Sequence, residues 1–372
     1  MLYEQVSLYT TTKKFDGEKM DKMKEKVCSF NSLYKAMYKC RKNVMWKDSV
    51  SGFVKNGLVN CYKLQKQLLN NAYKIDKYSV FTIYEPKKRQ IVSTRMKDRV
   101  FQRSLCDNYL YDAITKSFIH DNCACQLNKG TGFASDRLAC HMQRYFRKNG
   151  LDGYVLKCDL SNYFGSTSHK VAKDTVRARI DNDWINYHTD KIIDSFNQGE
   201  NPDVGMGLGS QITQLTQLAV LDKMDHMIKE KLGIKQYIRY MDDFILIHQD
   251  KEYLKYCLDE INKHVTGLNL KLSVKKTQIF PLKQGISFLG FRFYLTETGK
   301  VIRKLTKENV SHEKRKLKKM KKLVGDGVMT KANVDECYMS WKAHAKQGNT
   351  HNLILSMDKF YKNLWKEGST NV

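Results

Sequence analysis

The sequence predicts an α+β fold, in which amphipathic helices are interspersed with short apolar strands. Apolar residues recur every three or four positions over residues 54–73 and 212–230, as they do on the buried side of a helix. Short apolar runs with strand character lie at residues 154–159 and on both sides of residues 241–242. After residues 303–305 the chain becomes strongly basic and helical in pattern, so we expect a boundary there.

The first segment, residues 1–75, is predicted to be a basic helical extension. Phe30, Leu33 and Met37 recur at helical spacing, with Lys and Arg between them. Over residues 80–92 the pattern alternates around a turn that contains a proline, which predicts a β-hairpin. This hairpin opens the second predicted segment.

The second segment, residues 76–303, is predicted to hold most of the strands, and the third, residues 304–372, to be helical. Residues 160–211 are treated as a mainly polar stretch. The other predicted elements are helices at about residues 97–118, 133–148 and 252–265, a strand–turn–strand at 236–248, and strands at 286–293 and 300–302.

The charge balance restricts the class of partner. The 372 residues include 65 Lys and Arg against 39 Asp and Glu, a formal charge of +26, which favours a polyanion. An apolar content of 41% excludes a disordered basic tail. We find no apolar N-terminal segment and no run of about 18 apolar residues, so we expect a cytoplasmic protein without a membrane partner.

The ten cysteines are scattered and include no C-x-x-C pair. Cys123, Cys125 and Cys140, with His120 and His141 nearby, come nearest to a zinc-binding set. Their spacing does not match the usual arrangement of two ligands followed by two more. We therefore expect reduced thiols that are mostly buried.

Two adjacent aspartates, Asp242 and Asp243, lie between two apolar strands. Like charges side by side repel each other, so such a pair is tolerated at the surface or where a cation neutralises it. Asp159 ends another predicted strand, and if these strands are neighbours in one sheet the three carboxylates meet at one edge. Such a site can hold two Mg²⁺ about 3.5–4 Å apart and leave positions open for substrate phosphates. A solvated hairpin turn is the alternative interpretation.

The ordered set of motifs resembles bacterial reverse transcriptases over about residues 25–365. Tyr240-Met241-Asp242-Asp243 is similar to the catalytic box of that family, and Asp159 is similar to its first metal-binding aspartate. The resemblance implies a right-hand polymerase that copies RNA into DNA, with fingers and palm in the second segment and an α-helical thumb in the third.

The resemblance further implies two Mg²⁺ ions, with Mn²⁺ as a possible substitute. Their ligands would be Asp159, Asp242 and Asp243, which are also the catalytic residues, and the backbone carbonyl of Leu160. The ions would act on a primer 3′-hydroxyl and on the leaving pyrophosphate of a dNTP.

Further residues are implied to bind the dNTP. Phe164 falls five residues after the first aspartate, where the family carries an aromatic residue that excludes the ribose 2′-hydroxyl. Lys88 and Arg89 lie where the family has a basic pair that grips the triphosphate. Lys276 is similar to a lysine near the leaving pyrophosphate, and Lys275 is its rival.

The segment from Gly205 to Gln214 indicates a branch of the family. Leu208 precedes Gly209, where group II intron and retroviral enzymes usually have Gln, and this resembles the box of diversity-generating retroelement reverse transcriptases. In that branch the aliphatic residue goes with error-prone copying of template adenines, since it cannot hydrogen-bond to base or sugar. We expect Leu208 and Gln214 at the dNTP. Phage-defence (abortive-infection type) enzymes are the alternative, and intron- or retron-like roles are less favoured.

The expected partners are an RNA template, an RNA or DNA primer and dNTPs. A small helical accessory protein or a structured non-coding RNA is a further candidate partner, which would dock on the N-terminal extension. An RNA-directed RNA polymerase and a non-catalytic RNA-binding scaffold are the other functional classes considered. The thumb residues expected to contact the duplex backbone are Lys314, Arg315, Lys318, Lys319 and Lys322.

Overall fold

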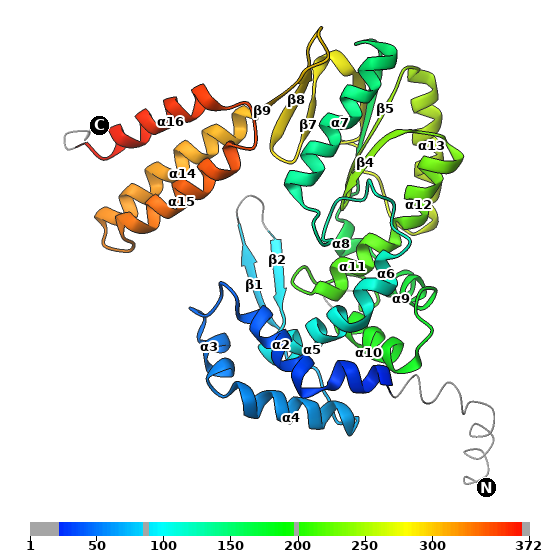
Figure 1. Ribbon diagram of the computed structural model, residues 1–372, viewed down its shortest axis with the longest axis vertical. Coiled ribbons are helices and arrows are strands. Elements are labelled where there is room, and N and C mark those ends of the chain that lie inside the picture. Colours follow the sequence, from blue (N-terminus) through cyan, green and yellow to red (C-terminus); the bar gives the residue numbers. More distant parts are fainter. Residues whose placement is uncertain (1–21, 85–88, 197–200, 367–372) are drawn as a thin grey trace. The chain divides into compact units, whose positions relative to one another are not determined.

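The computed structural model describes residues 22–84, 89–196 and 201–366 (Figure 1). Contacts between Cα atoms divide the chain into two compact units, each assembled from three segments of sequence. The predicted division into three segments, at 75/76 and 303/304, stays a prediction. Unit 1 comprises Met1–Cys125, Leu160–Lys231 and Glu260–Ser273, and unit 2 comprises Gln126–Asp159, Leu232–Asp259 and Val274–Val372.

Unit 1 is mainly helical. Its two strands form an antiparallel hairpin, which confirms the prediction for residues 80–92, although the turn at 85–88 lies outside the described residues. The strands are β1 (Ser79–Ile83) and β2 (Arg89–Ser93). The helices are α2 (Phe30–Arg41), α3 (Asp48–Lys55), α4 (Gly57–Leu69), α5 (Met96–Leu105), α6 (Tyr111–Thr115), α8 (Tyr163–Ser166), α9 (His169–Arg177), α10 (Asp183–Asp194), α11 (Gln211–Val220) and α12 (Asp222–His226).

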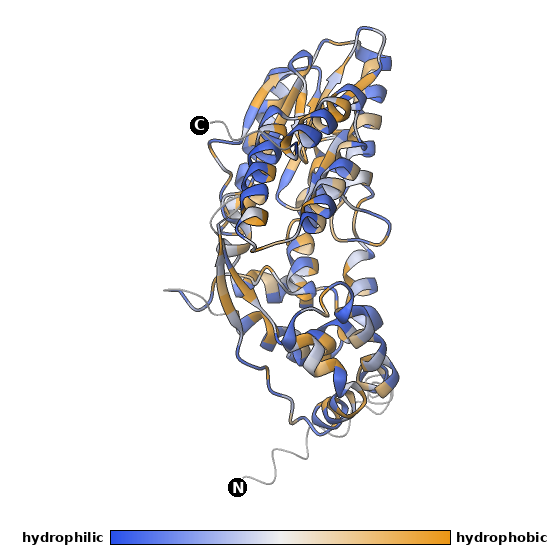
Figure 2. Cartoon of the chain, turned by 90° about the vertical axis from the view of Figure 1, so that its left-hand side faces the viewer, coloured by the Kyte–Doolittle hydropathy of each residue, from blue (hydrophilic) through white to orange (hydrophobic). Residues whose placement is uncertain are grey.

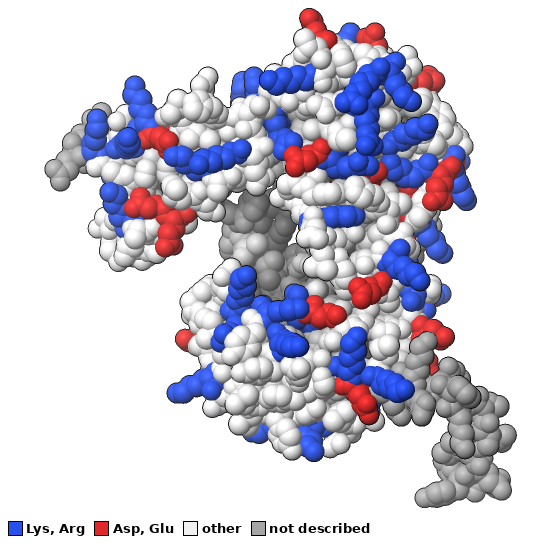
Figure 3. All heavy atoms as spheres, viewed as in Figure 1, with Lys and Arg blue, Asp and Glu red and all other residues white. Residues whose placement is uncertain are grey.

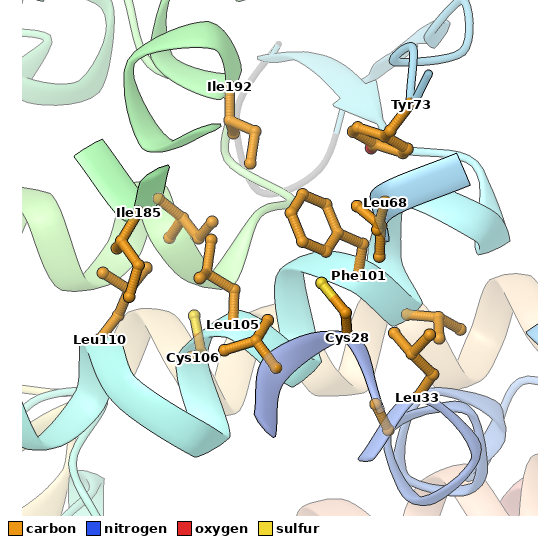
Figure 4. Packing of buried hydrophobic residues seen from close by; sticks show 14 of the residues in the cluster. Cys28, Leu33, Leu68, Tyr73, Phe101, Leu105, Cys106, Leu110, Ile185 and Ile192 are labelled. Atoms are coloured by element: carbon orange, nitrogen blue, oxygen red, sulfur yellow. The ribbon is translucent and has the colours of Figure 1, made fainter. Parts of the chain in front are cut away.

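The core of unit 1 joins its N-terminal helices to α9, α10 and α11. Helix α2 packs on α4 and α5, and each contributes one apolar face. In Figure 4 the ring of Phe101, from α5, lies among Cys28, Leu68 and Tyr73, and Leu105 points toward Ile185 of α10. Figure 2 shows apolar and polar residues side by side along the helices, as amphipathic packing requires.

Unit 2 is built on a four-stranded antiparallel sheet in the order β4-β5-β3-β6. The central strands β3 and β5 each have four apolar residues out of six, and most of their residues on both faces are buried. A second sheet has the order β7-β8-β9. The strands are β3 (Tyr154–Asp159), β4 (Gln236–Tyr240), β5 (Asp243–His248), β6 (Gln278–Pro281), β7 (Ile286–Phe288), β8 (Phe291–Leu295) and β9 (Val301–Leu305).

Helices complete unit 2. Helix α7 packs against β4, and α14 packs against α15 and α16. Helix α13 begins in unit 2 and ends in unit 1. The bounds are α7 (Thr131–Asn149), α13 (Lys251–Gly267), α14 (Lys307–Gly325), α15 (Lys331–Ala345) and α16 (His351–Leu364).

Three expectations about the elements need correction. The helix expected at 97–118 is interrupted by a π-helical turn, Cys106–Leu110, and the one expected at 212–230 is divided into α11, α12 and a second π-helical turn, Met227–Lys231. Residues 160–211, expected to be a polar stretch, contain α8, α9 and α10. The side chain of Asn182 accepts a hydrogen bond from the Ile185 amide and so caps the first turn of α10, whose Ile185 and Ile192 are buried in the core of unit 1.

The strand–turn–strand at 236–248 and the helical character of the described part of the tail are confirmed, whereas residues 1–21 of the predicted N-terminal extension lie outside the described residues. Over the described ranges, no helix is both long and apolar enough to cross a membrane.

Candidate active site

The three aspartates meet at one end of the sheet of unit 2. Asp159 is the last residue of β3, and Asp243 is the first residue of β5. The two are direct partners in the antiparallel register, so their side chains lie on the same face of the sheet with Cβ atoms about 4.5–5.5 Å apart. Asp242 precedes Asp243 in the tight turn between β4 and β5. Two distant parts of the sequence therefore bring their carboxylates together.

The turn that carries Asp242 has an uncommon backbone conformation. Met241 has a φ of 56°, in the left-handed region that side chains with a Cβ rarely adopt. The buried guanidinium of Arg239 donates a hydrogen bond to the Met241 carbonyl at 3.0 Å. Packing and this hydrogen bond hold the turn in place, which fixes the direction in which Asp242 leaves the sheet.

Two lysines neutralise part of this negative charge. Lys276 Nζ lies 2.6 Å from Asp159 Oδ2, and Lys157 Nζ lies 3.2 Å from Asp243 Oδ2. Lys157 stands two residues before Asp159 on β3, so both side chains lie on one face, and it also donates to the Ser287 carbonyl at 2.7 Å. The sequence prediction chose Lys276 and missed Lys157, although a lysine inside an apolar strand was a usable signal.

Asp243 remains electrostatically unsatisfied despite Lys157. Burial raises its pKa to about 6, and repulsion from Asp159 and Asp242 adds to the effect, while Lys157 opposes it. Its Oδ1 atom is buried and has no hydrogen-bond partner among the described residues. A buried, unpaired carboxylate oxygen next to two further carboxylates is an arrangement that a cation would stabilise.

The donor set fits a hard divalent cation, because carboxylate oxygens are the ligands that Mg²⁺ prefers. Within the part of the chain that is described, no three His, Cys, Asp or Glu side chains already form a closed metal-binding group. At this cluster, Asp159 and Asp243 are instead each paired with a lysine. A cation bound here would compete with the Lys276 ammonium for Asp159 Oδ2, whereas Lys157 leaves Asp243 Oδ1 unpaired.

The chain turns sharply after Asp159 and enters unit 1. Leu160 is buried and forms an isolated bridge with Leu272, and Asn162 takes a left-handed φ of 45° before α8. Phe164 lies on α8, half-buried against Ala172 and Met206. The Phe164 carbonyl accepts a hydrogen bond from the Met206 amide at 2.7 Å, which ties α8 to the segment that leads to Leu208.

Leu208 and Gln214 also lie in unit 1, both half-buried. Leu208 is in the turn before α11, and Gln214 is on α11. An added Cβ at Gly209 would lie 3.0 Å from the Val92 carbonyl oxygen of β2, so this glycine permits the close approach of the two segments.

Of the two residues predicted to bind the triphosphate, the structure describes only Arg89. Lys88 lies outside the described residues, and Arg89 is the first residue of β2, paired with Ile83. Lys275 is exposed, and no described contact joins it to the aspartates, in contrast to Lys276.

The basic residues of α14 form a stripe. Arg315, Lys318, Lys319 and Lys322 are exposed at positions that share one helix face, opposite the buried Leu317. Lys314 is half-buried, with its ammonium 5.4 Å from the centre of the Phe360 ring. Figure 3 shows Lys and Arg distributed over α14–α16 and over the rest of the visible face.

Comparison with known proteins identifies the family. The profile described as reverse transcriptase (RNA-dependent DNA polymerase) matches residues 75–293, more than half of the chain. No curated protein matches the sequence.

Among solved structures, the chain is similar to an apo telomerase from Candida tropicalis truncated from its C-terminal domain (13% identity, TM-score 0.46, 58% of this chain and 53% of that one). It is also similar to a telomerase from Candida albicans in complex with a TWJ fragment of telomeric RNA (10% identity, TM-score 0.46, 67% and 51%). This chain thus spans about half of the length of those telomerase chains. On the strength of the matched profile, the chain belongs to the reverse transcriptase family and carries an RNA-directed DNA polymerase domain, which is a nucleotidyltransferase domain.

Proposed function

We propose that this protein adds dNTPs to a primer 3′-hydroxyl on an RNA template, using two divalent cations held by Asp159, Asp242 and Asp243. The observation that carries the proposal is the register pairing of Asp159 with Asp243, which places the carboxylates at one sheet end. The matched family supports the choice of polymerisation over other metal-dependent chemistry.

Each residue of the cluster has a distinct task in this proposal. Asp159 and Asp243 supply carboxylate oxygens from neighbouring strands, Asp242 supplies a third from the strained turn, and Leu160 offers its backbone carbonyl. When bound, two Mg²⁺ would activate the primer hydroxyl and neutralise charge on the leaving pyrophosphate. Lys157 holds the Asp243 carboxylate in position from within the same sheet.

Lys276 would change partner during the reaction. In the absence of substrate its ammonium neutralises Asp159. If a divalent cation neutralised that carboxylate instead, Lys276 would be free to donate a hydrogen bond, and then a proton, to the departing pyrophosphate. Its exposed side chain and its place in a turn before β6 support such a movement.

The other predicted residues would select and hold the substrate. We assign Phe164 to exclusion of the 2′-hydroxyl, Lys88 and Arg89 to the triphosphate, and the basic stripe of α14 to the template–primer backbone. Hairpin β1–β2 would then belong to the fingers, the four-stranded sheet to the palm, and α14–α16 to the thumb. Backbone contacts of this kind position a duplex without reading its sequence.

Primer extension tests this function. Purified protein, a DNA primer annealed to an RNA template, dNTPs and Mg²⁺ should give extended product. Asp159→Asn and Asp242→Asn should abolish extension and leave RNA binding intact, whereas Glu297→Gln, an exposed carboxylate of unit 2, should retain it. Extension by the aspartate variants at the wild-type rate, or incorporation of NTPs in preference to dNTPs, would overturn the proposal.

We further propose that the enzyme is the mutagenic reverse transcriptase of a diversity-generating retroelement. Leu208 supports this role, because its side chain offers no hydrogen bond at the position where other branches place glutamine. Wild-type protein should misincorporate opposite template adenines more often than opposite other bases. Equal error rates opposite all four bases would favour the phage-defence alternative.

A further inference from the structure

Arg303 connects elements of unit 2 that are distant in the sequence. It lies on β9, the edge strand of the sheet β7-β8-β9. Its guanidinium pairs with Asp136 of α7, with Nη2 2.7 Å from Oδ1, and it donates through Nη1 to the Gln347 carbonyl at 3.1 Å. Gln347 belongs to the turn between α15 and α16, so this one side chain joins the sheet to α7 and to the helices that follow it.

The backbone of Arg303 makes a second connection to the same turn. Its amide donates a hydrogen bond to Asn349 Oδ1 at 2.8 Å, and its carbonyl accepts one from the Asn349 amide at 2.7 Å. Asn349 thereby satisfies both backbone groups on the open side of an edge strand, as a neighbouring strand would. In Figure 1 this turn lies beside β9.

The close approach of the turn to β9 depends on a glycine. An added Cβ at Gly348 would lie 2.8 Å from the Arg303 carbonyl oxygen and 2.9 Å from the ring of Phe291 on β8. Atoms this close would overlap, so a side chain at this position would push the turn away from the sheet. The Phe291 ring also contacts His344 of α15, with 4.9 Å between the ring centres.

The arginine is well placed to serve two acceptors at once. Its side chain is only 15% exposed, and its guanidinium carbon lies 5.4 Å from the centre of the ring of Phe293, its register partner on β8. A planar guanidinium presents several donors in fixed directions, whereas the ammonium of a lysine is a point charge on a flexible stem. Contact with both Asp136 and the Gln347 carbonyl therefore requires arginine.

These contacts link the three helices α14–α16 to the sheet that carries the aspartates. Helix α7 packs against β4, which leads into the turn of Asp242. Helix α14 follows β9 directly after Thr306 and carries the basic stripe. Contacts at Arg303 therefore restrict how the three helices can turn about their covalent connection to β9.

We propose that Arg303 is a positioning residue that determines how long the enzyme holds its template–primer duplex. With Asp136, Gln347 and Asn349 it forms a clamp that holds the basic stripe of α14 in one orientation relative to the aspartates. A stripe that is already ordered binds the duplex without first losing conformational freedom. This role rests on the proposed polymerase function, whereas the clamp itself can be tested without it.

Hydrogen exchange in the free protein tests the clamp. Arg303→Met keeps an aliphatic stem and removes the guanidinium. The control, Lys304→Met, removes one positive charge from the neighbouring, exposed position of β9. Amides of residues 347–354 should exchange at least about tenfold faster in Arg303→Met than in the control, while amides of β3 and β5 stay unchanged and report an intact fold. Equal exchange of residues 347–354 in the two variants would overturn the clamp.

Primer extension separates positioning from chemistry. With duplex already bound, the rate of the first nucleotide addition should differ by less than about twofold between Arg303→Met and Lys304→Met, because the aspartates are untouched. With heparin added to capture released enzyme, the number of nucleotides added per binding event should be at least about fivefold lower in Arg303→Met. Equal product lengths, or an equal loss in both measurements, would overturn the positioning role.

Arg303→Lys tests whether charge alone is sufficient. The lysine keeps a positive charge for Asp136 but cannot also reproduce the hydrogen bond to Gln347, so products should be shortened as in Arg303→Met. Products of wild-type length would contradict a clamp with two acceptors.

Gly348→Ala provides an independent perturbation that leaves Arg303 in place. Its Cβ should displace the turn from β9, so both the faster exchange and the shorter products should appear. The control is Gly325→Ala, at the end of α14, where an added Cβ meets no atom within 4 Å. Identical behaviour of the two alanine variants would contradict the clamp. If the wild-type protein extends no primer but the exchange differences are found, the polymerase proposal fails and the clamp stands.

Discussion

Replacing Asp243 by Asn should stabilise the metal-free protein while destroying its proposed activity. The buried carboxylate stands opposite Asp159, and its pKa is raised from 3.8 to about 6, chiefly by burial. At neutral pH this difference corresponds to about 3 kcal/mol of unfavourable free energy, since one pKa unit equals about 1.4 kcal/mol. Because the side chain is 22% exposed and water screens part of the charge, we expect a gain of about 1–3 kcal/mol.

Hydrogen exchange followed by mass spectrometry measures this gain in stability at the strands that carry the aspartates. In EDTA, amides of β3 and β5 should exchange about 5- to 150-fold more slowly in Asp243→Asn, as that range of free energy requires. Glu297→Gln removes one exposed negative charge from unit 2 and should change stability by less than about 0.5 kcal/mol.

Magnesium should reverse the order of stability. A cation that binds only the folded cluster stabilises wild-type protein by mass action, and it should stabilise Asp243→Asn much less. Unchanged or faster exchange of the variant in EDTA would refute the claim that the ionised Asp243 carboxylate destabilises the folded protein. Equal stabilisation of both proteins by Mg²⁺ would refute its role in binding the cation.

Three further outcomes are expected. Phe164→Val should raise the ratio of NTP to dNTP incorporation by at least about tenfold, as loss of a steric contact with one hydroxyl can do; an unchanged ratio would remove Phe164 from sugar selection. Leu208→Gln should lower misincorporation opposite template adenine in a sequenced cDNA pool, and equal error rates would contradict the retroelement role. Burial lowers the pKa of His188 to about 4, below the 6.5 of an unfolded histidine, so stability should fall by up to about 3 kcal/mol as the pH drops from about 6.5 to 4. His188→Phe should flatten this dependence in denaturant titrations, and an unchanged slope would exclude His188 as its origin.

The sequence was sufficient to predict the carboxylate edge because an apolar run that ends at a carboxylate is a local signal. Asp159 ends an apolar run and Asp242 and Asp243 separate two others, so a shared sheet implied that they meet. The pairing of Lys157 with Asp243 could not be found in the same way. It spans distant strands and depends on the register of β3 and β5, which no local pattern records.

Local sequence patterns also failed to predict the π-helical turns that interrupt two of the expected helices. A π-helical turn such as Cys106–Leu110 adds a residue to a turn without a Gly or Pro, so the apolar spacing still indicated one continuous helix. Helices α8, α9 and α10 were missed because α8 has only 4 residues and because α9 and α10 carry fewer apolar residues than polar ones. Their burial comes from tertiary packing, as for Ile185 and Ile192 in the core of unit 1.

Titration with Mn²⁺, followed by electron paramagnetic resonance in the presence of a dNTP, tests most directly whether the aspartates act as one site. Wild-type protein and Glu297→Gln should bind two ions with the same affinity. Asp159→Asn should lose at least one ion, even though this residue lies more than 80 positions from Asp242 in the sequence. Full occupancy of both ions in Asp159→Asn would contradict the convergence of the three carboxylates on which the proposed chemistry depends.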